Sequence, residues 1–261
     1  MTDDTGRIYL YCVIRDSGPL AVDAPPVSGQ GTVYPITDGG LTAVVSDGGL
    51  PKYELTRTNV RAHQAVLDCV LPSADVLPAR LGTTLPAADD VVENLLRERR
   101  GELLSLLDKV AGRVELGLKV SWADLQDAFR EVVAGDAGLR ALRDRLAARR
   151  GAAPYAAQLE LGDRAGQALA AARAREADRV IAALAPCAAD VRRNDPMSDL
   201  MILNAAFLVG RRERRAFEEA VEALDRADTG RLRFMLAGPL PAYNFVALTV
   251  VSRAAAGSLG G

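Results

Sequence analysis

The chain has 261 residues, of which 49% are hydrophobic and 25% charged, and its formal net charge is −2 at pH 7. This composition is typical of a soluble globular protein. The length exceeds that of most single compact cores, so we expect two domains. The chain has no excess of positive charge, which argues against a nucleic-acid partner.

The three cysteines and the chain ends add constraints on location. Cys12 and Cys69 lie inside apolar runs and Cys187 lies far from both, so we interpret Cys12 and Cys69 as small buried hydrophobic residues of a cytoplasmic protein. No signal peptide is expected after the acidic N-terminus. Residues 234–252 form the longest uncharged stretch, but the prolines near its start argue against a membrane span. Residues 253–261 are expected to be a disordered tail.

Residues 1–120 predict an N-terminal ferredoxin-like α+β sandwich with helices over one face of a small sheet. The expected elements are strands at 7–14, 33–36, 41–46 and 114–120, a further strand in the stretch 76–84, and helices at 56–71 and 89–110. Residues 7–14 are apolar on both alternating sets, which is typical of a central strand covered on both faces. In residues 114–120 apolar residues alternate strictly with other residues, so Glu115 and Lys119 are expected on the solvent-exposed face of a strand.

The segment 76–84 (VLPARLGTT) predicts a strand end followed by a constrained turn. Pro78 lacks an amide hydrogen and so suits an edge or the end of a strand. Gly82 can adopt backbone angles closed to other residues. Arg80 carries five donors in a rigid fork, which can tie loops together or meet a carboxylate of a partner. We favour the structural role for Pro78 and Arg80, with partner contact as the alternative.

Residues 121–252 predict a C-terminal α+β domain with added long helices, of which residues from about 122 to 186 form a helical hairpin. The expected elements are helices at 124–134, 136–150, 155–185 and 212–227 and strands at 190–193, 200–210 and 231–236. Helix 212–227 has a clear apolar stripe, and Arg214/Glu218 and Arg215/Glu219 pair at four-residue spacing on its other side. A solvated hairpin and a partner surface are the two interpretations of the long helices.

The residues offer no convincing catalytic constellation. His63 is the only histidine and falls on the apolar stripe of its helix, so we interpret it as a structural residue, with a general base or ligand as the alternative. A serine or cysteine nucleophile needs a base beside it, and Cys69 points away from His63 on the same helix. No zinc motif or phosphate-binding loop is present. We therefore predict a protein that is not an enzyme and has no cofactor and no metal site.

Five segments, in order over roughly residues 7–246, resemble those of the gas vesicle protein F/L family (GvpF/GvpL). They are residues 9–13 (YLYCV), His63 followed by 76–83 (VLPARLGT), 112–120 (GRVELGLKV), Asp199 with 204–209 (NAAFLV), and 238–245 (GPLPAYNF). The second departs from the family pattern at Leu81, where phenylalanine is usual. The last departs at Leu240, where tryptophan is usual, and at Ala242 and Asn244.

The resemblance implies an N-terminal ferredoxin-like domain followed by an α+β domain with long helices. It also implies an accessory or minor structural protein of gas vesicles that binds the main hydrophobic shell protein early in assembly. The alternative is a cytoplasmic scaffold that binds other gas vesicle accessory proteins. Tyr243 and Phe245 follow a Gly-Pro turn, and we expect them either to pack back on the second domain or to offer an apolar contact to a partner.

Overall fold

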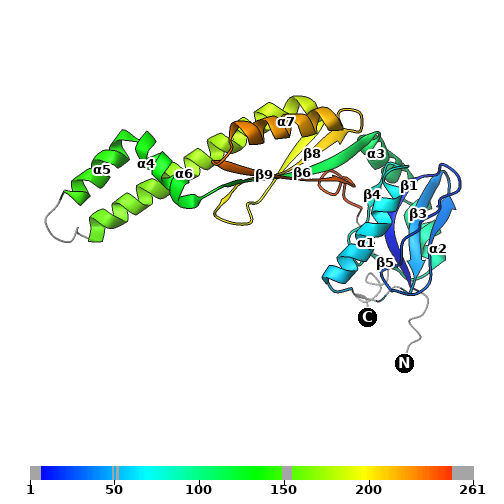
Figure 1. Ribbon diagram of the computed structural model, residues 1–261. Helices are drawn as coiled ribbons and strands as arrows, with labels where there is room; N and C mark the ends of the chain where they lie inside the picture. The colour runs from blue at the N-terminus through cyan, green and yellow to red at the C-terminus, as the bar shows by residue number, and fades with distance from the viewer. Residues whose placement is uncertain (1–6, 49, 51–52, 149–154, 249–261) are drawn as a thin grey trace. The chain divides into compact units, whose positions relative to one another are not determined.

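The computed structural model describes residues 7–48, 50, 53–148 and 155–248, and Figure 1 shows its helices and strands. The chain divides into two compact units, one made of the residues up to 115 and from 239 onward, the other of residues 116–238. The predicted α+β class, a mixture of helices and sheets, is confirmed, and the structure shows two antiparallel sheets. The described part of 239–252, which the sequence analysis placed in the C-terminal domain, groups with the first unit.

The first unit is built around a sheet in the order β2-β3-β1-β4, with β5 also paired to β1. Its elements are β1 (Ile8–Arg15), β2 (Val33–Asp38), β3 (Leu41–Asp47), α1 (Arg57–Val70), β4 (Leu77–Pro78), β5 (Thr84–Leu85), α2 (Ala88–Asp90), a π-helix η1 (Val91–Arg97) and α3 (Arg100–Val110). The central position predicted for the first strand is confirmed, since β1 is buried along its length except at Arg15.

A β-bulge in β1 decides which of its side chains share a face. The register with β3 shifts between Leu10 and Cys12. Tyr9 lies before the shift, Tyr11 is the extra residue within it, and both belong to one apolar cluster with Cys12 and Ile14, which follow it. Strict alternation would have divided these residues between the two faces, because an extra residue in a strand reverses the orientation of those that follow.

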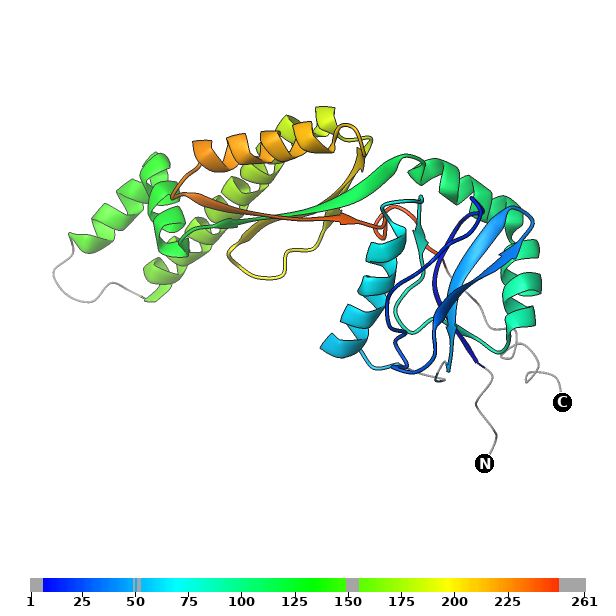
Figure 2. The ribbon, with the colours of Figure 1, turned by 45° about the vertical axis from the view of Figure 1, so that its right-hand side comes forward.

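Helices cover both faces of this sheet. Helix α1 packs on one face through Val66, Leu67 and Val70, and Figure 2 shows α1 and α3 on opposite sides of the strands. The prediction that the helices lie over one face is therefore wrong. The reason is visible in β1, whose two apolar sets each need a covering layer.

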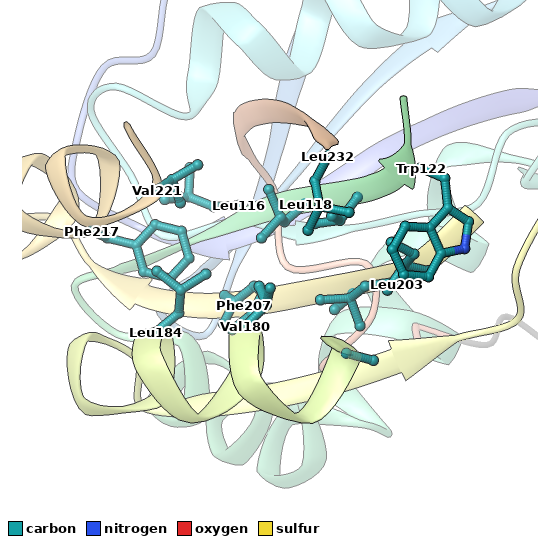
Figure 3. Packing of buried hydrophobic residues seen from close by; sticks show 14 of the residues in the cluster. Leu116, Leu118, Trp122, Val180, Leu184, Leu203, Phe207, Phe217, Val221 and Leu232 are labelled. Atoms are coloured by element: carbon teal, nitrogen blue, oxygen red, sulfur yellow. The ribbon is translucent and has the colours of Figure 1, made fainter. Parts of the chain in front are cut away.

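The second unit contains a sheet in the order β7-β8-β6-β9. Its elements are β6 (Arg113–Trp122), α4 (Leu125–Gly135), α5 (Ala137–Ala147), α6 (Tyr155–Leu184), a 3-10 turn η2 (Ala185–Cys187), β7 (Asp190–Asn194), β8 (Met201–Gly210), α7 (Arg214–Ala227) and β9 (Leu232–Leu240). The start of β6, up to Glu115, and the end of β9, from Pro239, belong to the first unit. Side chains of α6 and α7 pack on the apolar face of β6 and β8 (Figure 3). The rings of Phe207 and Phe217 meet at a centroid distance of 5.0 Å.

The helical part of this unit follows the sequence prediction closely. Asp124 and Asp136 begin α4 and α5 as N-caps, each accepting hydrogen bonds from two backbone N–H groups. Val133, Leu139 and Ala165 form a small cluster that holds the three helices together. Of the helices that the structure describes, none combines the length and apolar character needed to cross a bilayer.

Strand β9 extends further than the sequence suggested. It continues through Gly238 and Pro239 to Leu240, and the turn begins only at Pro241. A proline is tolerated here because β9 lies at the end of the sheet order, where an outward-facing position needs no amide hydrogen for the ladder.

Candidate functional site

A polar network around the buried His63 lies in the first unit, and it reaches the exposed Tyr243. It joins Tyr9 of β1, His63 of α1 and Tyr243, which follows β9. The Tyr9 hydroxyl lies 2.9 Å from Nδ1 of His63, and the Tyr243 hydroxyl lies 3.2 Å from Nε2. The Gly82 N–H lies 3.1 Å from the Tyr9 oxygen. Two tyrosines that are far apart in the chain, Tyr9 and Tyr243, thus both bind the ring of His63.

One arrangement of protons gives a partner to both ring nitrogens of His63 and to the Tyr9 hydroxyl. The Gly82 N–H donates to the Tyr9 oxygen, which leaves the Tyr9 O–H to donate to Nδ1 of His63. The His63 Nε2–H then donates to the Tyr243 oxygen. This pattern requires the neutral imidazole, since a protonated ring would have two donors and no acceptor for Tyr9.

Burial acts in the same direction on the histidine. His63 is 4% exposed, and desolvation lowers its pKa to about 4, against a smaller opposing effect of the Ala79 backbone. The ring also stacks on Tyr11, with centroids 5.5 Å apart. Burial raises the pKa of the Tyr9 and Tyr243 hydroxyls. The network is therefore uncharged at neutral pH, and the prediction of a structural histidine is supported by its geometry.

Glu115 is the second anchor of this site, and its position corrects the sequence analysis. The alternating pattern placed it on a wet face, but it is 3% exposed. Its carboxylate accepts the Asn244 N–H at 2.8 Å and the Asn244 side-chain amide at 2.6 Å. Burial raises the pKa of Glu115, and these two hydrogen bonds oppose the shift. The burial is possible because Asn244 satisfies both oxygens.

Pro78, Arg80 and Gly82 form the predicted strand end and turn. Pro78 pairs with Cys12 of β1 and is buried. Gly82 has φ of +84°, and the Arg80 carbonyl accepts from both the N–H and the hydroxyl of Thr83. The Arg80 side chain is exposed and makes no hydrogen bond or ion pair with the described residues. Arg80 thus contributes to the turn through its carbonyl.

Tyr243 and Phe245 lie in the turn that follows β9. The expectation that they pack on the second domain is wrong for Tyr243, because its hydroxyl is bound by His63 of the first unit. Phe245 is half-buried, and its N–H donates to the Ala242 carbonyl. Further along, Leu248 forms a parallel bridge with Ala79. The end of the described chain therefore lies against the segment that contains Pro78 and Arg80.

The cysteines divide differently from the prediction. Cys12 is buried, and desolvation raises the pKa of its thiol. Cys69 is exposed, so the expectation of burial is wrong. The buried positions of α1 are His63, Val66, Leu67 and Val70, and Cys69 falls outside this stripe despite its apolar neighbours.

A network of ion pairs occupies the second unit. Arg179 of α6 pairs with Asp228 at the end of α7, and Arg231 pairs with both Glu176 and Asp228. Burial would raise the pKa of Asp228, but hydrogen bonds from Arg231 and Arg179 lower it overall. The predicted pairs of Arg214 and Arg215 on α7 are also present. These groups neutralise one another and hold α6 to α7.

Within the described ranges, no cluster of three or more His, Cys, Asp or Glu residues is placed to hold a metal ion.

Comparisons with known proteins define the class. The family model of the gas vesicle synthesis protein GvpL/GvpF matches residues 7–247. The chain belongs to this gas vesicle protein family.

Individual relatives match along nearly their whole length. Gas vesicle protein F of a Streptomyces species is 33% identical, over 91% of this chain and 98% of the relative. Gas vesicle protein F of a Nostoc species is 27% identical, over 93% and 98%. The crystal structure of GvpF from an Anabaena species is similar with a TM-score of 0.83 at 27% identity, covering 94% of this chain and all of the other.

The polar network brings together four of the five segments that resemble the family. Tyr9 lies in the first, His63 and Gly82 in the second, Glu115 in the third, and Tyr243 and Asn244 in the last. The sequence analysis named His63 and Tyr243 separately, and nothing in their spacing indicated that they are partners. It missed Tyr9 and Glu115 as members of the site.

Proposed function

We propose that this protein is a non-enzymatic assembly factor and minor shell component of gas vesicles. It binds the main hydrophobic shell protein, limits its aggregation and helps to nucleate the vesicle. The observation that carries this proposal is the match of a gas vesicle synthesis family to residues 7–247. Relatives named gas vesicle protein F that align over almost their whole length support it further.

The physical reason for such a factor lies in the chemistry of a gas-filled shell. A subunit with an apolar face aggregates in water unless that face is held or polymerised. A binding protein for it needs apolar surface of its own. In the second unit Met197 is 70% exposed, Met235 66% and Leu200 41%. These side chains are suited to contact an apolar partner.

The polar network argues for a structural use of the only histidine. Both ring nitrogens of His63 are engaged by tyrosine hydroxyls, so neither is free to serve as a general base. This geometry favours a binding protein over a hydrolase that uses His63. The proposed location is the gas vesicle, with the unassembled protein in the cytoplasm.

A cytoplasmic scaffold for other accessory proteins is the second candidate. The exposed Phe129 of α4 and Leu159 of α6, at 41% and 53% exposure, favour it because they lie on the helical part of the second unit. In this case the protein never enters the shell.

Deletion and complementation in a vesicle-forming host test the proposal. We expect deletion to reduce vesicle number and to move shell protein into the insoluble fraction, and the restored gene to reverse both effects. Unchanged vesicle number and shell-protein solubility would contradict the assembly role. Retention of the tagged protein on washed, floated vesicles would favour the minor-component role over the scaffold.

A further inference from the structure

Strand β9 forms one end of the sheet in the second unit. The order β7-β8-β6-β9 gives it a single neighbour among the strands that the structure describes. The strand is nine residues long, and from Phe234 to Leu240 it carries no charge. Phe234 and Leu236 remain half-buried, and Met235 is exposed. Such an edge offers main-chain hydrogen-bonding groups beside apolar side chains.

The other edge of the same sheet is protected in the ordinary way. Strand β7 has five residues, and Arg192 and Arg193 are exposed on it. Arg192 pairs with Asp190 and Arg193 with Asp178. Charged side chains and short length discourage the addition of another strand. Strand β9 also carries the exposed Arg233 and, near its end, Pro239, which limits strand addition there, but it is longer than β7, and from Phe234 to Gly238 it has neither a charge nor a proline.

A groove of about 590 Å³ is lined by residues of β9, of its neighbour β6 and of the chain at the start of β8. Its apolar lining consists of Trp122, Ala123, Leu200, Met201, Leu232, Phe234 and Met235. Methionine is suited to varied apolar partners because its side chain is flexible and polarisable. The indole nitrogen of Trp122, a residue only 3% exposed, has no hydrogen-bond partner in the described part of the chain. Figure 3 shows it pointing away from the apolar cluster.

The charges of the groove indicate the chemistry of its occupant. Lys119 and Arg233 line it, and neither makes an ion pair within the described ranges. Arg179, Arg226 and Arg231 of the same unit are all paired. Asp225 is the acidic residue in the lining. Two cations against one carboxylate leave a net positive site, which a carboxylate on the partner would complement.

We propose that the β9 edge and this groove bind an extended, apolar peptide segment that bears a carboxylate and belongs to another protein. The segment adds to the sheet as a further strand beside β9, so main-chain hydrogen bonds supply affinity and the groove selects alternate side chains. Lys119 and Arg233 bind the carboxylate. The proposal goes beyond the proposed function, since it holds whichever protein supplies the segment.

Site-specific photo-crosslinking of the full chain in vesicle-producing cells tests it. A benzoylphenylalanine is placed at Met235, with Arg192 on β7 as the matched control, and the crosslinked peptides are sequenced by mass spectrometry. We expect position 235 to capture an apolar, carboxylate-bearing segment of another protein at much higher yield than position 192. Equal yields at the two positions would overturn the proposal. Capture of a second copy of this chain or of a basic segment would overturn it too.

Charge reversal provides the second measurement. The double variant Lys119→Glu/Arg233→Glu is expected to lower the crosslinking yield at position 235 about tenfold or more, because like charges then face each other. The matched variant Arg192→Glu/Arg193→Glu is expected to leave it within about twofold. Circular dichroism confirms that both variants are folded. An unchanged yield in the folded Lys119→Glu/Arg233→Glu variant would refute recognition of a carboxylate.

Discussion

Acidification is expected to destabilise this protein through His63. The folded state holds the ring neutral, between a Tyr9 hydroxyl that donates to it and a Tyr243 oxygen that accepts from it. Protonation removes the acceptor for Tyr9 and places a charge in a site that is 4% exposed. The unfolded chain meets neither penalty. Lowering the pH from 7 to 4 is therefore the perturbation that tests the network most directly.

The magnitude follows from the pKa of His63, which falls from 6.5 to about 4 on folding. Between these values the unfolded chain binds a proton that the folded chain does not, so the free energy of unfolding falls as the pH falls. Each pKa unit corresponds to about 1.4 kcal/mol, which gives an upper value of about 3 kcal/mol over the window. The contribution is fully present above pH 6.5 and is lost on approaching pH 4.

Glu115 contributes with the opposite sign. Burial raises its pKa in the folded state, so the folded chain binds this proton at a higher pH than the unfolded chain. Its stabilising contribution is present below the unfolded pKa and is lost as the pH rises through the folded pKa. The wild-type pH profile combines both groups, and a comparison with the His63→Gln variant isolates the histidine.

Urea denaturation of the wild type and of His63→Gln at several pH values between 7 and 4 measures the difference. We expect the wild type to lose more stability on acidification than the variant, by up to about 3 kcal/mol. Because His63 is the only histidine, NMR of its ring protons gives an independent titration. A ring that titrates near 6.5, or parallel stability profiles of the two proteins, would refute the buried neutral network.

Three substitutions test other parts of the structure. Tyr243→Phe removes the hydroxyl that lies 3.2 Å from Nε2 of His63 and is expected to cost about 1 kcal/mol in urea denaturation. Tyr155→Phe, at a residue 79% exposed, is the control and should change little, so equal effects of the two substitutions would contradict the bond. Phe217→Ala, at a fully buried ring, is expected to cost about 3–5 kcal/mol of unfolding free energy, and a loss below 1 kcal/mol would contradict the packing. Arg80→Ala is expected to change stability by less than about 0.5 kcal/mol because the side chain is exposed, so weaker shell-protein binding at unchanged stability would mark Arg80 as a partner contact.

Local patterns predicted most helices and strands because their signals are periodic and short in range. The doubly apolar run of β1 requires a buried central strand wherever it folds. The aspartates at 124 and 136 begin α4 and α5 by capping the adjacent N–H groups. Such features depend on neighbours within a few positions, which the sequence displays directly.

The polar site could not be assembled from the sequence in the same way. His63 and Tyr243 are separated by 180 positions, and Glu115 and Asn244 by 129. The alternating pattern predicted a solvent-exposed Glu115. A carboxylate can be buried when hydrogen-bond donors pair with it, and here the donors belong to a residue far away in the chain. The face on which Cys12 and Ile14 lie also depended on a β-bulge that no residue pattern indicated. A periodic pattern in the sequence does not show which polar groups form hydrogen bonds with residues far away in the chain.

The assembly role itself is tested most directly by co-expression of the tagged protein with the main shell protein, followed by pull-down and solubility fractionation. Our account predicts that the shell protein co-purifies with the bait and that more of it stays soluble than in cells without the bait. A folded bait that neither binds the shell protein nor changes its solubility would contradict the account. The same pull-down against the other accessory proteins would then examine the scaffold alternative.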